Sequence, residues 1–321
     1  MRSPLIIAHR GASGYRPEHT LESYELAIEM GADFIEPDLV ISRDGHLIAR
    51  HENNITETTD VAERAEFAAR KICKLIDNKT VTGWFSEDFT LAELKTLRAK
   101  ERLPFRNQTY NGQFQTPTLR EILTLAQQKT QETGREIGIY PETKHPSYFQ
   151  SIGLPLEEPL VKILQEFGYT SSVSPLFIQS FEIANLKKLN QMIDVPLVQL
   201  LGEENQQPYD LVLQADKRTY QDLTTPAGLS QIAAYADAIG PSKRLIIPQT
   251  EDSQLLPPTL LIQEAHQVGL KVHAWTFRNE ACFLASEYQN QPEREYKQFF
   301  QLGVDGVFSD FPDVAFKVRE S

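Results

Sequence analysis

Two acidic residues stand two positions apart in an apolar stretch near the N-terminus. Glu36 and Asp38 lie within Phe34–Val40, and residues two apart on a β-strand point to the same face of the sheet. Two carboxylates on one face of an apolar strand are costly to bury unless a cation neutralises them. A hard divalent cation takes such oxygen ligands, and an arginine or lysine partner is the alternative. The pair therefore predicts a metal site, with an ion pair as the competing interpretation.

A third carboxylate supports the metal interpretation. Glu142 follows the apolar run Glu136–Tyr140 and precedes Lys144, so it stands at the C-terminal end of another expected strand. By itself this pattern fits a structural Glu–Lys salt bridge slightly better. Together with Glu36 and Asp38, it completes an all-carboxylate site, typical of Ca²⁺ or Mg²⁺, with positions open for water or substrate oxygens.

Two histidines follow two other expected strands. His9 and Arg10 come after Leu5–Ala8, and His51 comes shortly after Leu47–Ala49. Imidazole groups titrate near neutral pH, so a pair that flanks a metal-bound phosphate can divide the roles of general base and general acid. An arginine can hold phosphate oxygens with two parallel hydrogen bonds. Taken singly, the first histidine is equally well explained as a capping residue, and the second better as a surface residue.

Strands and helices alternate along the chain and must position these residues. Apolar, β-branched runs are separated by amphipathic segments. The expected strands are Leu5–Ala8, Phe34–Val40, Leu47–Ala49, Glu136–Tyr140, Leu176–Ile178, Val195–Leu201, Arg244–Ile247, Leu270–Ala274 and Gly306–Phe308. The expected helices are Thr20–Met30, Thr118–Gln128, Pro159–Phe167, Glu182–Asn190, Ala227–Ala238 and Pro258–Val268. About eight such strands favour a closed (β/α)₈ TIM barrel, which displays functional residues at the C-terminal ends of its strands. A dinucleotide-binding sheet is disfavoured, because no GxGxxG motif follows the first strand.

One segment interrupts the alternation. Residues 52–115 are polar and include the helix-like stretches Val61–Lys74 and Leu91–Arg98. A structureless loop of this length would be unusual in a compact domain. We therefore expect one barrel over residues 1–321, with residues 52–115 as a small inserted subdomain over the barrel mouth.

The composition argues against several classes of protein. The chain has 32 Lys and Arg against 44 Asp and Glu, a formal net charge of −12, so a nucleic acid is not expected as a partner. No apolar run is long enough to span a bilayer, and we expect neither a stable membrane anchor nor a signal peptide in this chain. Cys73 and Cys282 lack the spacing of a zinc site or a disulfide framework. A periplasmic protein whose leader has been removed and a cytoplasmic protein fit equally, and the oligomeric state stays open.

A series of motifs, in order along nearly the whole chain, resembles the glycerophosphodiester phosphodiesterase family. The motifs are Ile7–Ser13, Pro17–Leu21, Gly31–Leu39, Asp44–Gly45, His51, Pro141–Lys144, Ile178–Phe181, Val272–Thr276 and Ser309–Asp313. The resemblance implies a (β/α)₈ barrel that hydrolyses glycerophosphodiesters to sn-glycerol 3-phosphate and an alcohol such as choline, ethanolamine or glycerol. The implied roles are metal ligands for Glu36, Asp38 and Glu142, a catalytic pair for His9 and His51, and phosphate contacts for Arg10 and Lys144.

Finer features give further expectations. His19 and the long insertion resemble the periplasmic, calcium-using branch of the family. Pro37 removes a backbone donor between the two ligands and is expected to perturb the strand. Trp275 fits a pocket wall and a core position equally, and we expect Asp310 and Asp313 to cap the last helix.

Two rival functions remain. A phospholipase D-like or other phosphodiesterase acting on lipid head groups would keep the barrel, but no hydrophobic surface helix is evident. A non-catalytic barrel that only binds ligands is disfavoured by the intact set of three carboxylates and two histidines.

Overall fold

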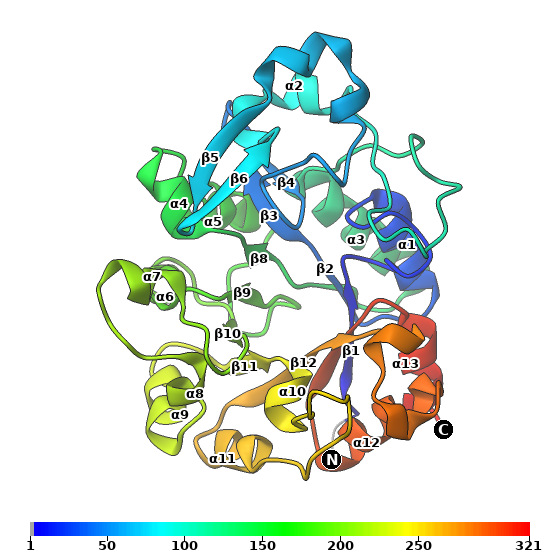
Figure 1. Ribbon diagram of the computed structural model, residues 1–321, viewed down its shortest axis with the longest axis vertical. Helices are drawn as coiled ribbons and strands as arrows, with labels where there is room; N and C mark the ends of the chain where they lie inside the picture. The colour runs from blue at the N-terminus through cyan, green and yellow to red at the C-terminus, as the bar shows by residue number, and fades with distance from the viewer. Residues whose placement is uncertain (1–2) are drawn as a thin grey trace.

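The N-terminal strand closes the sheet into a barrel (Figure 1). In the computed structural model, which describes residues 3–321, β1 (Leu5–His9) pairs in parallel with β2 (Phe34–Glu36) on one side and with β13 (Gly306–Ser309) on the other. The ring continues through β3 (Asp38–Ile41), β7 (Gly138–Ile139), β8 (Glu142–Thr143), β9 (Ile178–Ser180), β10 (Leu197–Leu201), β11 (Ala238–Pro241) and β12 (Lys271–Phe277). Its pairings are all parallel. With β2/β3 and β7/β8 each counted once, eight strands form the ring, which confirms the predicted (β/α)₈ barrel.

Two neighbouring barrel strands are each split in two by a proline. Pro37 separates β2 from β3, and Pro141 stands just before β8. Because proline has no N–H to donate, it interrupts the ladder of a strand. The first halves of the two strands pair with each other, β2 with β7, and so do the second halves, β3 with β8. The three acidic residues of interest therefore border the two breaks, which confirms the expected effect of Pro37.

Alternating side chains give the barrel an inner and an outer apolar layer. Ile7, Phe34, Tyr140, Val198 and Phe308 are members of a buried cluster from inward-facing strand positions. The intervening positions pack against the surrounding helices in a second, larger cluster. This alternation follows from the two-residue period of a strand. Since His9 is two positions beyond Ile7 on β1, it continues the inward-facing row to the C-terminal rim.

Helices surround the barrel (Figure 1). Helix α1 begins after Thr20, whose side chain accepts a hydrogen bond from the backbone N–H of Ser23, and α3 begins with a capping box formed by Thr118 and Glu121. The longer helices are α1 (Leu21–Glu29), α3 (Leu119–Thr133), α4 (Pro146–Ser151), α5 (Glu157–Glu166), α6 (Ile183–Met192), α9 (Pro226–Ile232), α11 (Leu261–Gln267), α12 (Pro292–Leu302) and α13 (Pro312–Arg319). Shorter ones are α7 (Tyr209–Leu213), α8 (Tyr220–Leu223) and α10 (Lys243–Ile246). No helix within residues 3–321 has the length and apolar character needed to cross a membrane.

One of the expected strands was assigned wrongly, and another lies outside the barrel. Arg244–Ile247 is not a strand, because Ser242 caps a short helix there and α10 occupies Lys243–Ile246. The barrel strand of this region is β11, at the end of the expected helix Ala227–Ala238, and α9 stops earlier at Ile232. Leu47–Ala49 does form a strand, β4, but it pairs antiparallel with β3 and lies outside the parallel ring.

The segment of residues 52–115 also differs from its expected local structure. Instead of one helix over Val61–Lys74, there are two 3₁₀ helices, η1 (Val61–Glu63) and η2 (Ala65–Arg70), followed by β5 (Ile72–Ile76). Strand β5 forms an antiparallel hairpin with β6 (Lys79–Gly83) through Asp77 and Asn78, both with positive φ, as such tight turns require. The expected helix Leu91–Arg98 is shortened to α2 (Leu91–Leu94). Strands β5 and β6 and helix α2 project from one end of the molecule (Figure 1).

Candidate active site

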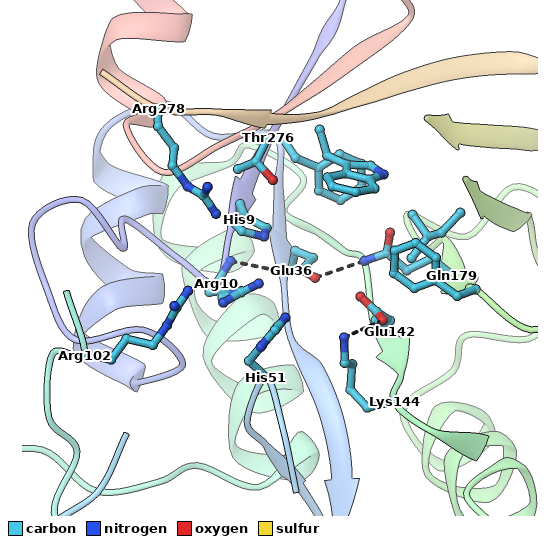
Figure 2. Close-up of a pocket in the computed structure, with 14 residues that line it drawn as sticks. His9, Arg10, Glu36, His51, Arg102, Glu142, Lys144, Gln179, Thr276 and Arg278 are labelled. Carbon is cyan, nitrogen blue, oxygen red and sulfur yellow. Dashed lines mark hydrogen bonds and ion pairs between the residues drawn. The ribbon is translucent and has the colours of Figure 1, made fainter. Parts of the chain in front are cut away.

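A cavity of about 280 Å³ lies where the barrel strands end. Figure 2 shows charged side chains from several strands directed into it. Six of the residues singled out from the sequence line this cavity: His9, Arg10, Glu36, His51, Glu142 and Lys144. The seventh, Asp38, is buried beside them and is joined to Arg10, with its Oδ2 at 3.2 Å from the arginine Nε. The structure thus brings all seven predicted residues together.

The three carboxylates form one compact group. Glu36, Asp38 and Glu142 each offer an oxygen within 4.8 Å of the others, and all three are buried. Burial and the charge of Asp38 raise the pKa of Glu36 well above its usual range and that of Glu142 to about 8. For Asp38, burial acts in the same direction, but the charges of Lys144 and Arg10 hold its pKa well below the usual range. The three carboxylates repel one another, and a bound divalent cation would offset this repulsion. Hard cations such as Ca²⁺ and Mg²⁺ prefer carboxylate oxygens as ligands. The donor set therefore fits a metal ion.

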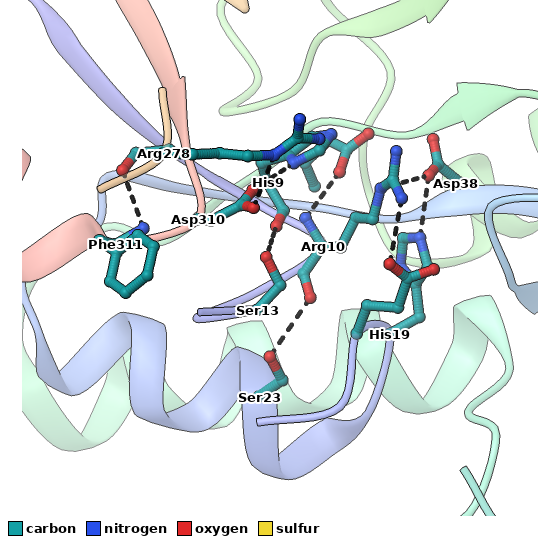
Figure 3. A network of polar contacts seen from close by, with 12 residues as sticks. His9, Arg10, Ser13, His19, Ser23, Asp38, Arg278, Asp310 and Phe311 are labelled. Carbon is teal, nitrogen blue, oxygen red and sulfur yellow. Dashed lines mark hydrogen bonds and ion pairs between the residues drawn. The ribbon is translucent and has the colours of Figure 1, made fainter. Parts of the chain in front are cut away.

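The turn after β1 holds two of these carboxylates in place. Arg10 has a φ of 62°, and its backbone N–H donates to Glu36 Oε2 at 2.8 Å. His19 Nε2 lies 2.9 Å from Asp38 Oδ2, and its Nδ1 lies 2.7 Å from the hydroxyl of Tyr24. His19 therefore holds the carboxylate of Asp38 in position (Figure 3). Contacts of this kind orient metal ligands.

Arg10 and Lys144 supply positive charge to the cavity. Lys144 Nζ lies 2.9 Å from Glu142 Oε1, and the Arg10 Nη1 lies 3.1 Å from Glu18 Oε2. Burial would lower the pKa of both groups, but the surrounding carboxylates outweigh it and raise both pKa values. Both side chains are therefore fixed cations at the strand ends, placed to attract an anionic group.

The expected capping role of Asp310 is wrong. The residue at the start of α13 is Phe311, whereas Asp310 is buried and its Oδ1 lies 2.6 Å from His9 Nδ1 (Figure 3). Its other oxygen, Oδ2, accepts hydrogen bonds from Arg106 Nη2 at 2.6 Å and Arg278 Nε at 3.0 Å. Burial would raise the pKa of Asp310, but His9 and the two guanidinium groups hold it well below its usual range. Asp313, also expected to cap, accepts from the Tyr15 hydroxyl at 3.0 Å.

The two histidines differ in their surroundings. Burial, followed by the charge of Arg10, lowers the pKa of His9 to about 4 even though Asp310 acts in the opposite direction. His51 lies 3.2 Å from Glu52 through its Nδ1, and burial together with Arg10 and Lys144 lowers its pKa well below the usual range. Burial and the neighbouring cations therefore favour the neutral form of both imidazoles, which can accept a proton.

Several cavity residues were missed by the sequence analysis. Arg102 and Arg278 line the cavity, and Arg106 stands behind it. The two arginines from the 52–115 segment lie in irregular chain, where no periodicity reveals the direction of a side chain. Gln179 belongs to the motif Ile178–Phe181, and its position directly after the expected strand Leu176–Ile178 could have marked it as a cavity residue. Trp275 does line the cavity, and its Nε1 donates to Gly240 O at 2.7 Å.

Comparisons with known proteins show the family of the chain. Residues 9–314 match the Glycerophosphoryl diester phosphodiesterase family. The Arabidopsis thaliana protein named glycerophosphodiester phosphodiesterase GDPD6 is 40% identical, with 96% of this chain and 84% of the relative covered. A Haemophilus influenzae glycerophosphodiester phosphodiesterase is 30% identical, with coverages of 96% and 88%.

Solved structures share the fold. An Oleispira antarctica phosphodiesterase in complex with the product sn-glycerol-3-phosphate superposes with a TM-score of 0.64 at 21% identity, over 99% of this chain and 97% of that one. The Agrobacterium tumefaciens glycerophosphodiester phosphodiesterase gives a TM-score of 0.62 at 18% identity, over 97% and 98%. At this level of identity, the likeness concerns the fold. The family match and the two sequence relatives show that the chain belongs to the glycerophosphoryl diester phosphodiesterase family.

Proposed function

We propose that the cavity hydrolyses glycerophosphodiesters to sn-glycerol 3-phosphate and an alcohol, with one divalent cation, Ca²⁺ or Mg²⁺. The observation that carries this proposal is the meeting of three buried carboxylates with two histidines at the strand ends. Family membership and the names of the sequence relatives support the same reaction. The cation and the role of each residue are part of the proposal.

Glu36, Asp38 and Glu142 would hold the cation. When bound, such an ion withdraws electron density from the phosphorus centre and offsets developing negative charge. Arg10 and Lys144 bind the phosphate oxygens, because both are buried cations that line the same cavity as Glu36 and Glu142. Preorganised charges of this kind stabilise the transition state without having to reorient during the reaction.

His9 and His51 move the protons. One neutral imidazole takes the proton of the attacking hydroxyl group, and the other, which must carry an extra proton for this step, donates it to the departing alcohol. Asp310 accepts a hydrogen bond from Nδ1 of His9, which fixes the tautomer and leaves Nε2 for the substrate. Arg106 and Arg278 keep Asp310 ionised in this role.

Replacing each histidine tests the assignment. His9→Ala and His51→Ala should abolish release of glycerol 3-phosphate from glycerophosphocholine while cation binding, measured by calorimetry, stays close to wild type. His266→Ala is the matched control, because the His266 side chain pairs with the partly exposed Asp305 and does not line the cavity. Near-wild-type turnover by either cavity variant would overturn the proposed roles.

A further inference from the structure

Gln179 sits between the carboxylate group and the apolar side of the cavity. It is in the middle of β9, is 1% exposed, and lines the cavity. Its Nε2 donates to Glu36 Oε1 at 3.0 Å (Figure 2). A cation-binding carboxylate offers only acceptors, so the amide nitrogen must face Glu36. The amide oxygen is thereby directed away from the carboxylates.

This amide oxygen has no donor. Within residues 3–321, no hydrogen-bond partner reaches Gln179 Oε1, although the atom is buried. Buried side-chain acceptors in folded proteins nearly always have a partner. In Figure 2 the amide nitrogen of Gln179 faces Glu36, and its oxygen is turned away from that carboxylate. An acceptor fixed in this way is suited to a ligand that brings its own donor.

The neighbouring strand provides a contrasting glutamine. Gln199 on β10 is equally buried, but its Oε1 accepts from the Tyr235 hydroxyl at 2.9 Å. Its Nε2 donates to the backbone oxygen of Phe181 at 3.0 Å. Gln199 does not line the cavity. The protein therefore satisfies the structural glutamine internally and leaves only the cavity glutamine with a free acceptor.

The chemistry of the substrate identifies the donor. A phosphodiester anion has acceptor oxygens and no proton at neutral pH, so it cannot satisfy Gln179 Oε1, whereas glycerol carries hydroxyl donors. The lining of the same cavity includes the apolar side chains of Leu200, Trp275 and Phe308, and Thr276 adds a hydroxyl. Such a wall suits the carbon chain of glycerol, with polar groups at its edge.

We propose that Gln179 determines specificity for the glycerol part of the substrate by accepting a hydrogen bond from one of its hydroxyl groups. This inference rests on the proposed glycerophosphodiester hydrolysis and adds to it the position of the glycerol, against Leu200, Trp275 and Phe308. The other alcohol is then directed away from this wall. Gln179 thus has two tasks, since its nitrogen supports Glu36 while its oxygen recognises the substrate.

Two phosphates that differ only in hydroxyl groups test the inference. The affinities of glycerol 3-phosphate and n-propyl phosphate are measured by calorimetry on the Ca²⁺-loaded protein. The wild type should prefer glycerol 3-phosphate by about tenfold, the effect of roughly one buried hydrogen bond. In Gln179→Met, a variant of similar shape, this preference should fall close to one. Because the result is a ratio, any weakening of cation or phosphate binding affects both ligands equally.

Two further variants control for misfolding and for a general effect of replacing a buried glutamine. If Gln179→Met fails to fold, Gln179→Leu should show the same loss of preference. Gln199→Met should keep the wild-type preference. An unchanged preference in a folded Gln179 variant, or no preference in the wild type, overturns the inference. If the wild type releases no glycerol 3-phosphate from glycerophosphocholine, the proposed function fails instead, and the ligand preference is still measured separately.

Discussion

The Nδ1 of His9 lies 2.6 Å from the Oδ1 of Asp310, which follows it by 301 residues. His9 ends β1 and Asp310 directly follows β13, and these are the strands whose pairing closes the barrel. The contact therefore exists only because the two ends of the barrel sheet meet. Arg106 adds a third distant segment, since its guanidinium donates to the other oxygen of Asp310 at 2.6 Å.

Removing the charge of Asp310 should slow the reaction far more than it weakens substrate binding. In Asp310→Asn, the amide can present its N–H to His9 and so favour the wrong tautomer, and we expect kcat to fall by about 10²-fold or more with KM little changed. The measurement is steady-state hydrolysis of glycerophosphocholine at saturating cation. Asp313→Asn is the matched control, because this carboxylate contacts the Tyr15 hydroxyl and not His9. Equal losses in both variants would contradict the orienting role.

Replacing Arg106 should destabilise the fold as well as the site. The side chain is 6% exposed and contacts both Glu280 and Asp310 at 2.6 Å. Arg106→Met leaves these carboxylates with fewer partners, and loss of one partner from a buried pair costs about 3–5 kcal/mol. Urea unfolding measures this free energy. Arg64→Met, which removes a more exposed pair with Asp60, should cost only about 0–1 kcal/mol. A similar loss in the free energy of unfolding for both variants would show that the buried ion pairs of Arg106 stabilise the fold no more than an exposed pair does.

Loss of a carboxylate ligand should appear first in the cation requirement. Glu36→Gln and Glu142→Gln should raise the concentration of Ca²⁺ or Mg²⁺ needed for half-maximal activity by at least about tenfold. EDTA should abolish wild-type activity, and added cation should restore it. Glu182→Gln provides the control, because Glu182 is also a buried carboxylate but contacts Ser147 outside the carboxylate group. An EDTA-insensitive wild type would exclude the metal site.

The docking of the β5–β6 hairpin should weaken at alkaline pH. His145 lies 2.5 Å from Asp77 in the hairpin turn and 2.8 Å from Glu52. Burial lowers its pKa, but these two carboxylates outweigh burial and raise it to about 9. A raised folded-state pKa adds stability that is complete below about pH 6.5 and is lost as the pH rises through about 9.

The variant His145→Gln should therefore be less stable than wild type at pH 6, by up to about 3 kcal/mol, and the difference should shrink by pH 10. Urea unfolding at several pH values between these limits provides the test. A difference that stays constant with pH would show that the charge of His145 does not hold the hairpin.

Local patterns were enough to predict the barrel and the core of its site. Strand alternation alone places Glu36 and Asp38 on one face, and both lie in the carboxylate group. The repeated strand and helix signals indicated the (β/α)₈ fold because each unit buries its apolar face in the same way. They could not separate β11 from α10, since both are four-residue segments, too short to show a distinguishing period.

The sequence by itself therefore determined the fold class, the carboxylate pair, and the residues whose types suit phosphate chemistry. Only the tertiary structure placed Asp310 on His9, brought Arg106 from the 52–115 segment to Asp310, and left the buried amide oxygen of Gln179 without a partner within residues 3–321. The physical reason is distance along the chain. Side-chain direction within one strand follows from its local period, whereas contacts between residues far apart depend on how the barrel closes and how irregular segments fold over it.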